Sequence, residues 1–385
     1  METRVALQRV RRYDQDEIEV ALAAALKPFG GISAFVKPGQ RVLLKVNTLM
    51  PSNPKNSVTT HPAVVSAVAK AVLLAGATPI IADSPGGPYQ PKLLEATYRA
   101  TGLWDMATRL GVELNLDCSS FELEAPNSRL VHRFVCIKPV LDADVIFSLC
   151  KLKTHGFMMY TGAVKNLFGV IPGMAKSEFH LKMPREADFA AMLVDLCEAI
   201  QPDLSIMDGI MAMEGDGPSG GKPRLMQSLL VSPNPHALDL TACGIIALKP
   251  DQVPTLQEAL LRNLIPQEVM DLDLYGEPLV NLAVNDFLLP QHRLRRAQAE
   301  SSGVRGRVGR MLSNRLRPHP VFSRRKCVRC GRCLQSCPPQ CLTMGARSPR
   351  IDLGRCIRCY CCHELCPAKA IRVNSPGLAR WIFKQ

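Results

Sequence analysis

The sequence has no apolar run long enough to cross a membrane. The longest candidate, residues 63–82, is interrupted by Lys70, Gly76 and Pro79, so it predicts a helix, a turn and a strand instead. The first residues lack the apolar stretch and the small-residue cleavage site of an export signal. We therefore expect a cytoplasmic protein without a transmembrane segment, in which clustered thiols bind metal more often than they form disulfides.

Signatures of nucleotide and nucleic-acid binding are also missing. No GxGxxG stands at a strand–helix junction and no Walker sequence occurs, so a bound NAD, flavin or ATP is not indicated. Residues are only 5% aromatic, and the basic stretch at residues 293–326 has no interleaved aromatic side chains for stacking on single strands. A DNA-reading motif is absent as well, and specific nucleic-acid binding is not expected.

Acidic residues are scarce in one segment. The formal net charge is +13, and residues 293–326 contain eleven Lys and Arg against a single acid, Glu300. Because this segment has no sustained periodicity, we interpret residues 291–325 as a basic linker. Solvated charge is one explanation of its composition, and docking of an acidic redox partner is the functional alternative.

Strand and helix patterns alternate through residues 1–290, which predicts an α/β domain with a mostly parallel sheet flanked by helices. The predicted strands are residues 41–46, 78–82, 112–116, 144–149 and 204–207. The predicted helices are residues 14–26, 61–76, 91–101, 158–168, 188–200 and 254–264. Asp14 followed by Glu17 predicts a capping box at the first helix.

Cysteine is abundant in one place, because ten of the 15 cysteines lie between Cys327 and Cys366. The run C-x₂-C-x₂-C-x₃-C-P occurs twice, at Cys327 to Pro338 and at Cys356 to Pro367. In such runs the first three thiolates hold one cubane cluster, and the fourth binds the cluster of the other run. We therefore predict two [4Fe–4S] clusters with these ligands: Cys327, Cys330, Cys333 and Cys366 for one, and Cys356, Cys359, Cys362 and Cys337 for the other.

Residues 326–374 resemble the bacterial two-[4Fe–4S] ferredoxins, which implies a small α+β domain that transfers electrons. Zinc is the alternative, since C-x₂-C pairs also bind zinc. Cys341 and Cys361 stand opposite Ala370 and Arg332 in the repeat, so both are expected to be ordinary thiols, although Cys361 could replace its neighbour Cys362. Basic residues in the two loops should raise the cluster potentials. Residues 375–385 form a C-terminal tail.

Polar residues cluster where predicted strands end. They are Lys45, Asn47, Asp83, Lys151, Lys153, His155 and Asp208, the last leading into a glycine-rich stretch with Gly217 and Gly220. Because ligands bind at the carboxyl ends of strands in open α/β sheets, we predict a cleft for an anionic substrate or a phosphate-bearing cofactor. The structural alternative for each residue is an ordinary polar turn. The candidate cofactor-binding residues are Lys45, Asn47, Lys153, Gly217 and Gly220, and the candidate acid–base groups are Asp83, His155 and Asp208.

The large domain resembles a family called domain of unknown function 362. The matching stretches are KVN at residues 45–47, TTHP at 59–62, DSPGG at 83–87, KLKTH at 151–155, TGAVKNLFGVIPG at 161–173 and EGDGPSGG at 214–221. The resemblance covers residues 3–290. Members often carry a ferredoxin-like module, and the family name implies no activity.

A more distant resemblance is to the lactate racemase family, through the order His155, Thr161-Gly162, Lys165, Pro172-Gly173 and His180. It implies that Lys165 holds a nickel-pincer nucleotide, and that His155 and His180 ligate nickel or move protons. The chain departs from that family at residues 83–87, which contain no histidine. The proton-transfer pair is therefore incomplete, and racemisation is not implied.

Three functions follow from these observations. In the first, an oxidoreductase passes electrons from its clusters to a substrate, with Lys45, Lys153 and Lys165 binding an anion. His155, Lys165, Asp83 and Asp208 are its candidate catalytic residues. In the second, the chain is a non-catalytic electron carrier or adaptor. In the third, it is a nickel- or nucleotide-dependent enzyme whose clusters are regulatory or structural.

Overall fold

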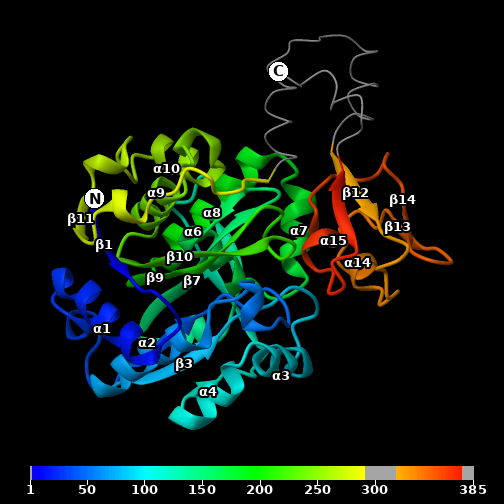
Figure 1. Ribbon diagram of the computed structural model, residues 1–385. Coiled ribbons are helices and arrows are strands. Elements are labelled where there is room, and N and C mark those ends of the chain that lie inside the picture. The colour runs from blue at the N-terminus through cyan, green and yellow to red at the C-terminus, as the bar shows by residue number, and fades with distance from the viewer. Residues whose placement is uncertain (1, 291–317, 375–385) are drawn as a thin grey trace.

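The computed structural model describes residues 2–290 and 318–374 of the 385-residue chain (Figure 1). Most of the predicted basic linker and all of the predicted tail, residues 375–385, lie outside the described residues. In the part that is described, no helix is long and apolar enough to cross a membrane. Residues 2–290 form a large α/β domain, and residues 318–374 form a small α+β domain beside it.

A mixed sheet forms the centre of the large domain. Its strand order is β11-β1-β10-β9-β7-β2-β3-β4, and β8 pairs with β7. The run from β9 to β4 is parallel, whereas β10 is antiparallel to both β1 and β9. The strands are β1 Arg4–Arg9, β2 Arg41–Lys45, β3 Thr78–Ala82, β4 Glu113–Leu114, β7 Val145–His155, β8 Met159–Thr161, β9 Leu204–Glu214, β10 Lys222–Ser232 and β11 Asp273–Gly276. Strands β5 Ser120–Glu124 and β6 Arg133–Ile137 form a separate hairpin.

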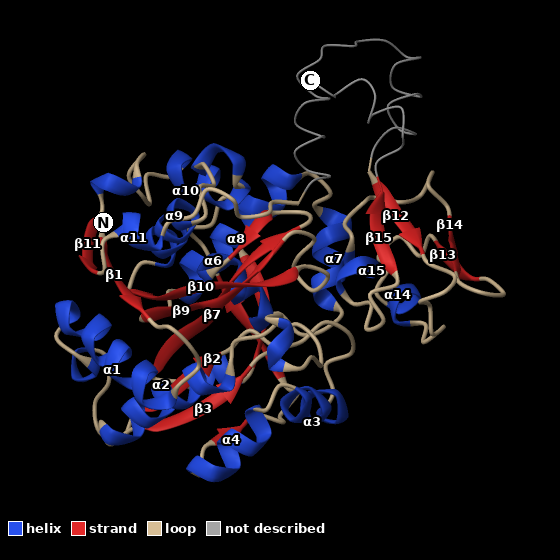
Figure 2. Cartoon of the chain, viewed as in Figure 1, coloured by secondary structure: helices blue, strands red, loops and turns tan. Residues whose placement is uncertain are grey.

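Helices cover both faces of this sheet (Figure 2). Successive residues of β7 show why: Phe147 and Leu149 pack in the core with α1 and α2, whereas Cys150 and Leu152 pack with α9 and α10. A strand buried on both faces reads as a continuous apolar run, as the sequence does here. The helices are α1 Gln15–Leu26, α2 Pro62–Leu74, α3 Pro91–Ala100, α4 Leu103–Leu110, α5 Pro139–Asp142, α6 Ala163–Asn166, α7 Ala175–Lys182, α8 Glu186–Ile200, α9 Pro235–Ile245, α10 Pro254–Leu261 and α11 Leu279–Leu282.

Three local predictions are corrected. Residues 158–168 do not form one helix, because the chain turns back at residues 156–158, so that Met159 pairs with His155 in β8 before the short α6 begins. Strands β7 and β9 run well past their predicted ends, so Lys153 and Asp208 lie inside strands. Only half of the capping box forms: Asp14 accepts from the backbone of Glu17, but the Glu17 carboxylate accepts from another residue, Arg11.

The small domain has two short two-stranded sheets. Strand β12 (His319–Phe322) pairs with β15 (Ile371–Asn374), and β13 (Leu342–Met344) pairs with β14 (Pro349–Ile351). Helices α14 (Arg332–Gln335) and α15 (Cys361–Glu364) lie in the two cysteine loops. Helix α15 faces the large domain, which places the second cysteine run at the domain contact (Figure 1).

Tyr360 anchors this contact. Its φ angle is +63°, and the equivalent residue of the first cysteine run is Gly331, with φ +77°. A non-glycine residue in the left-handed region costs roughly 1–2 kcal/mol. The Tyr360 side chain is buried in the core around α8, and its hydroxyl donates to the Pro318 carbonyl at 3.1 Å. Packing against the large domain therefore offsets backbone strain that the first run avoids.

Candidate functional site

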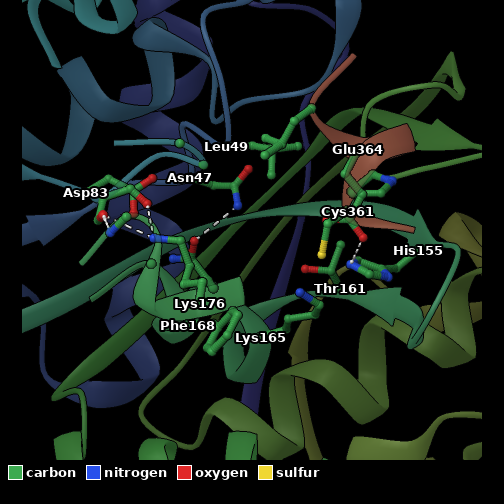
Figure 3. A pocket seen from close by; sticks show the side chains of 18 of the residues that line it. Asn47, Leu49, Asp83, His155, Thr161, Lys165, Phe168, Lys176, Cys361 and Glu364 are labelled. Carbon is green, nitrogen blue, oxygen red and sulfur yellow. Dashed lines mark hydrogen bonds and ion pairs between the residues drawn. The ribbon is translucent and has the colours of Figure 1, made fainter. Parts of the chain in front are cut away.

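A cavity of about 90 Å³ lies between the two domains. The carboxyl ends of β2, β3 and β7 form one side of it, and helix α15 forms the other (Figure 3). The large domain contributes the four lysines Lys45, Lys153, Lys165 and Lys176. The small domain contributes Cys361, Glu364 and Leu365. The predicted cleft therefore exists, but a second domain covers it.

Three of the lysines are held by neighbouring groups. The Lys45 ammonium lies 2.9 Å from a carboxylate oxygen of Asp83, and both side chains are buried. Lys153 donates to the Asn47 side-chain oxygen and to a backbone carbonyl, both at 2.7 Å. Lys176 donates to two backbone carbonyls, at 2.9 and 2.7 Å. Asp83 thus neutralises Lys45, whereas Lys153 and Lys176 are bonded to neutral acceptors.

Lys165 differs from the other three. No hydrogen bond or ion pair to its ammonium group is found among residues 2–290 and 318–374, and its nitrogen lies 5.5 Å from the centroid of the Phe168 ring. It lines the cavity beside Thr161 (Figure 3). Its donors are therefore available to a ligand in the cavity.

The short helix α6 positions Lys165 through a buried carboxylate. Asp239 accepts from the backbone nitrogens of Ala163 at 2.6 Å and Val164 at 3.1 Å, and from the Tyr160 hydroxyl at 3.0 Å. Burial raises the pKa of Asp239 to about 6, although these hydrogen bonds oppose the change. Asp239 caps the first turn of α6, where free N–H groups favour negative charge. Sequence reasoning missed it, because Asp239 is distant in the chain and lies inside helix α9.

Burial lowers the pKa values of three of the cavity lysines. It lowers the pKa of Lys153 and of Lys176 to about 7, and it lowers the pKa of Lys165 as well. Each of these changes reflects the difficulty of keeping an ammonium group away from water. A bound anion would favour the charged forms, so the cavity is suited to a negatively charged ligand.

Glu364 and His155 meet across the domain contact, with 3.3 Å between His155 Nε2 and Glu364 Oε1. His155 Nδ1 accepts from the backbone nitrogens of Phe157 and Met158, at 3.0 and 3.2 Å, so the neutral ring carries its proton on Nε2. Burial raises the pKa of Glu364, and Lys165 and Lys153 oppose that change. An imidazole N–H group and a carboxyl group therefore face each other at the border of the cavity.

The structure brings together most of the predicted site residues but not all. Those that line the cavity are Lys45, Asn47, Asp83, Lys153, His155, Lys165 and His180. Asp208 does not: it is buried, paired with Lys151 at 2.8 Å and hydrogen-bonded to Tyr13 at 2.9 Å. Because β9 continues beyond Asp208, its carboxylate serves this internal network, and the predicted catalytic role is not supported.

Gly217 and Gly220 are not among the residues that line the cavity, so their ligand-binding role stays a prediction. A Cβ atom on Gly217 would collide with the backbone carbonyl of Thr154. A Cβ atom on Gly220 would lie 2.8 Å from the Asp216 carbonyl and 2.9 Å from His363. These glycines permit close packing of their loop on β7 and α15.

The cysteines gather around two further cavities. One is lined by Cys327, Cys330, Cys333 and Cys366, and we call it the outer cluster site because Cys330 is exposed. The other is lined by Cys337, Cys356, Cys359 and Cys362, and we call it the inner cluster site because Cys359 and Cys362 are each only 8% exposed. Each set contains the crossed cysteine, so four thiols converge as a [4Fe–4S] cluster requires. Cys341 lines the inner site as a fifth thiol.

Comparison with known proteins assigns both domains. Residues 42–244, more than half of the chain, match the family described as Domain of unknown function (DUF362). The chain belongs to the DUF362 family. Residues 319–367 match the description 4Fe-4S dicluster domain, which supports iron–sulfur clusters rather than zinc and an electron-transfer role for the small domain.

Relatives of this DUF362 protein include a thylakoid-associated protein of Synechocystis, 39% identical over 257 residues that make up 66% of this chain and 77% of that protein. The lactate racemase apoprotein of Thermoanaerobacterium thermosaccharolyticum aligns with a TM-score of 0.40 and 14% identity over 62% of this chain. A Thermotoga maritima protein aligns with a TM-score of 0.33 and 14% identity over 56% of this chain. The chain spans 56% and 55% of those two solved chains, little more than half of each.

A bound nickel-pincer nucleotide stays a prediction, since no observation on this structure tests it. Pockets for cofactor-sized ligands measure roughly 300–1,000 Å³, whereas the cavity measures about 90 Å³. His180 is buried and stacked on Phe189, with 4.3 Å between ring centroids, and burial lowers its pKa to about 3. The cavity is therefore smaller than such pockets, and a carboxylate or phosphate group is a ligand of matching size.

Proposed function

We propose that this DUF362 protein is an iron–sulfur oxidoreductase that exchanges electrons with a small anionic substrate held between its two domains. The observation that carries the proposal is that helix α15 contributes residues both to the inner cluster site and to the cavity. Cys362 of this helix lines the inner cluster site, whereas Cys361 and Glu364 line the cavity that holds the lysines. An inner cluster would thus lie next to the bound substrate.

The size and charge of the cavity support a small anion. The cavity volume of about 90 Å³ is well above the roughly 10–15 Å³ that a single buried water needs. Four lysines line it, against the two carboxyl groups of Asp83 and Glu364. Lys165 can give charge-assisted hydrogen bonds to a carboxylate or phosphate oxygen. We therefore favour a small carboxylate or a similarly compact anion as the substrate class.

The positions of the two cluster sites support a path for electrons through the small domain. The outer site reaches the surface at Cys330, and the inner site borders the substrate cavity. Electrons exchanged with a partner protein at the outer site would cross the small domain to the inner site. The proposal therefore assigns partner contact to one cluster and substrate contact to the other.

The experiment that tests this function uses full-length, cluster-loaded protein without oxygen. The reduced clusters are mixed with a panel of small carboxylates and with the uncharged amides of the same compounds, and their visible absorbance is followed. We expect at least one carboxylate to reoxidise the clusters while its amide does not. If every carboxylate leaves the clusters reduced although an added ferredoxin reoxidises them, the protein is a carrier rather than an oxidoreductase.

Anion binding should weaken as pH rises. Lys153 and Lys176 have pKa values of about 7, so both are ammonium groups below that pH and neutral amines above it. The affinity for acetate, used as a probe, should therefore fall by up to about tenfold per pH unit for each proton lost above about pH 7. Calorimetric titration across this range measures it. Lys153→Met should flatten the profile, and an affinity that rises with pH would contradict the assignment.

The redox partner should be acidic. Residues 318–374 contain eleven Lys and Arg but only two acids, Asp352 and Glu364, and Glu364 is buried at the domain contact. Arg324, Arg347 and Arg350 line a groove that shares Phe322 and Pro349 with the outer cluster site. A negatively charged partner would be attracted to this face, and salt would weaken the attraction.

Reduction by an acidic ferredoxin should accordingly slow at high salt. Reversing two charges of the groove, in the double variant Arg347→Glu with Arg350→Glu, should slow it at low salt as well. Arg12→Glu is the matched control, since Arg12 is an exposed arginine of the large domain. Stopped-flow kinetics measure the rates. A double variant that reacts like wild type would show that the partner does not bind at this face. As a control, the rate of reduction by dithionite should be the same in all of these proteins.

A further inference from the structure

One buried thiol beyond the eight predicted ligands lies against the inner cluster site. Cys341 lines this site, and its Sγ is 3.4 Å from Cys337 Sγ. Cys341 is only 5% exposed. The ligand Cys337 therefore has a neighbouring thiol, whereas the other additional cysteine, Cys361, lines the cavity that holds the lysines.

The outer cluster site has no thiol at the equivalent position. Ala370 occupies the position of the repeat that corresponds to Cys341, and it lines the outer site. The basic residue before each run, Lys326 or Arg355, is matched in the other copy. The Cys341 thiol is thus a difference between the two sites.

A fifth thiol cannot add a ligand to a cubane cluster whose four corners already carry cysteines. It remains protonated, and its S–H group can donate to a neighbouring ligand sulfur, which is an acceptor when it is a thiolate. Hydrogen bonds to the ligand sulfurs are among the factors that set iron–sulfur potentials. They stabilise the added negative charge of the reduced cluster more than they stabilise the oxidised cluster, and so they raise its potential.

We propose that Cys341 donates an S–H hydrogen bond to the ligand Cys337 of the inner cluster and raises the potential of that cluster, which favours the electron on the side of the substrate cavity. The Cys341 thiol lies within hydrogen-bond distance of its ligand sulfur. The inference rests on the proposed function only in naming the cavity as the place where the electron is used.

The test is an equilibrium redox titration of the full-length holoprotein, followed by electron paramagnetic resonance in the absence of substrate. In Cys341→Ala, one of the two midpoint potentials should become more negative while the other stays where it is. Cys341→Ser keeps a donor at this position and should produce the smaller change. Iron and acid-labile sulfide should be unchanged in both variants.

A reciprocal variant makes the test sharper. Ala370→Cys introduces a thiol at the equivalent position of the outer site, beside Cys366, whose sulfur already accepts from the backbone nitrogen of Ala370 at 3.2 Å. This variant should move the other midpoint potential to a more positive value. It adds a thiol rather than removing one, so a shift in this direction cannot come from simple damage to a ligand loop.

Each remaining outcome overturns the inference. Loss of about half of the iron in Cys341→Ala would make Cys341 a ligand. Unchanged midpoint potentials would mean that the hydrogen bond does not affect the potential of the cluster. Equal shifts of both potentials would indicate a long-range effect instead. The titration contains no substrate, so its results do not depend on whether the cavity is reactive. Failure of the proposed function can therefore be distinguished from failure of this inference.

Discussion

Replacing Lys165 with alanine is expected to slow reoxidation of the reduced clusters by an anionic substrate roughly 10- to 100-fold. A charge-assisted hydrogen bond contributes about 1.5–3 kcal/mol, and each 1.4 kcal/mol corresponds to about a factor of ten. Lys165 is the appropriate target, because the other three cavity lysines are bonded to Asp83, Asn47 and backbone carbonyls. Its removal should take away ligand binding while leaving those structural contacts intact.

The matched control is Lys182→Ala, which removes an exposed lysine of α7 that is 3.5 Å from Glu178. It should react at the wild-type rate. Iron content should be unchanged in both variants, since Lys165 touches no cysteine ligand. If Lys165→Ala keeps its full rate and its iron, the cavity does not bind the reacting anion, and the carrier function becomes the better account.

Replacing Cys337 with alanine is expected to remove the inner cluster and to abolish reoxidation by substrate. Cys337 belongs to the first cysteine run, but it lines the same cavity as Cys356, Cys359 and Cys362 of the second run. Half of the iron and acid-labile sulfide should be lost, and the outer cluster should remain the redox-active group. Because the crossed ligands tie both runs together, the melting temperature of the small domain should fall as well.

Cys341→Ala is the matched control for this loop, since it removes a thiol four residues later and should retain both clusters. The spectrum of Cys337→Ala should match that of Cys359→Ala and differ from that of Cys330→Ala. A spectrum that matched Cys330→Ala instead would mean that each run holds its own cluster, which would contradict the crossed assignment.

Much of the fold was predictable because its signals are local. Residues 78–82 were predicted as a strand and form β3, and the spacing of the cysteines predicted the dicluster domain that the family comparison supports. Local signals failed where contacts between distant residues decide the structure. Residues 158–168 look helical by themselves, but pairing with β7 converts their first part to a strand.

The candidate site was predictable only in part. Lys45, Asn47 and Asp83 were found because parallel strands end at one edge of a sheet, and Lys165 was found by family resemblance. Asp208 follows the same strand-end rule yet lies elsewhere, because β9 continues past it and Lys151 pairs with its carboxylate. Lys176, Cys361 and Glu364 were missed, since nothing in the local sequence of any of them indicates a cavity.

The sequence by itself determined the α/β class, the two cysteine runs and most of the cationic side chains at the strand ends, because each depends on periodicity or spacing within a short stretch. Only the tertiary structure decided that α15 covers those cations. This contact depends on Tyr360 packing into the large domain and on Ser219 donating to the Glu364 carbonyl at 2.6 Å. Residues so distant in the chain come into contact only when the whole structure buries them together. These contacts place the inner cluster site beside the cavity.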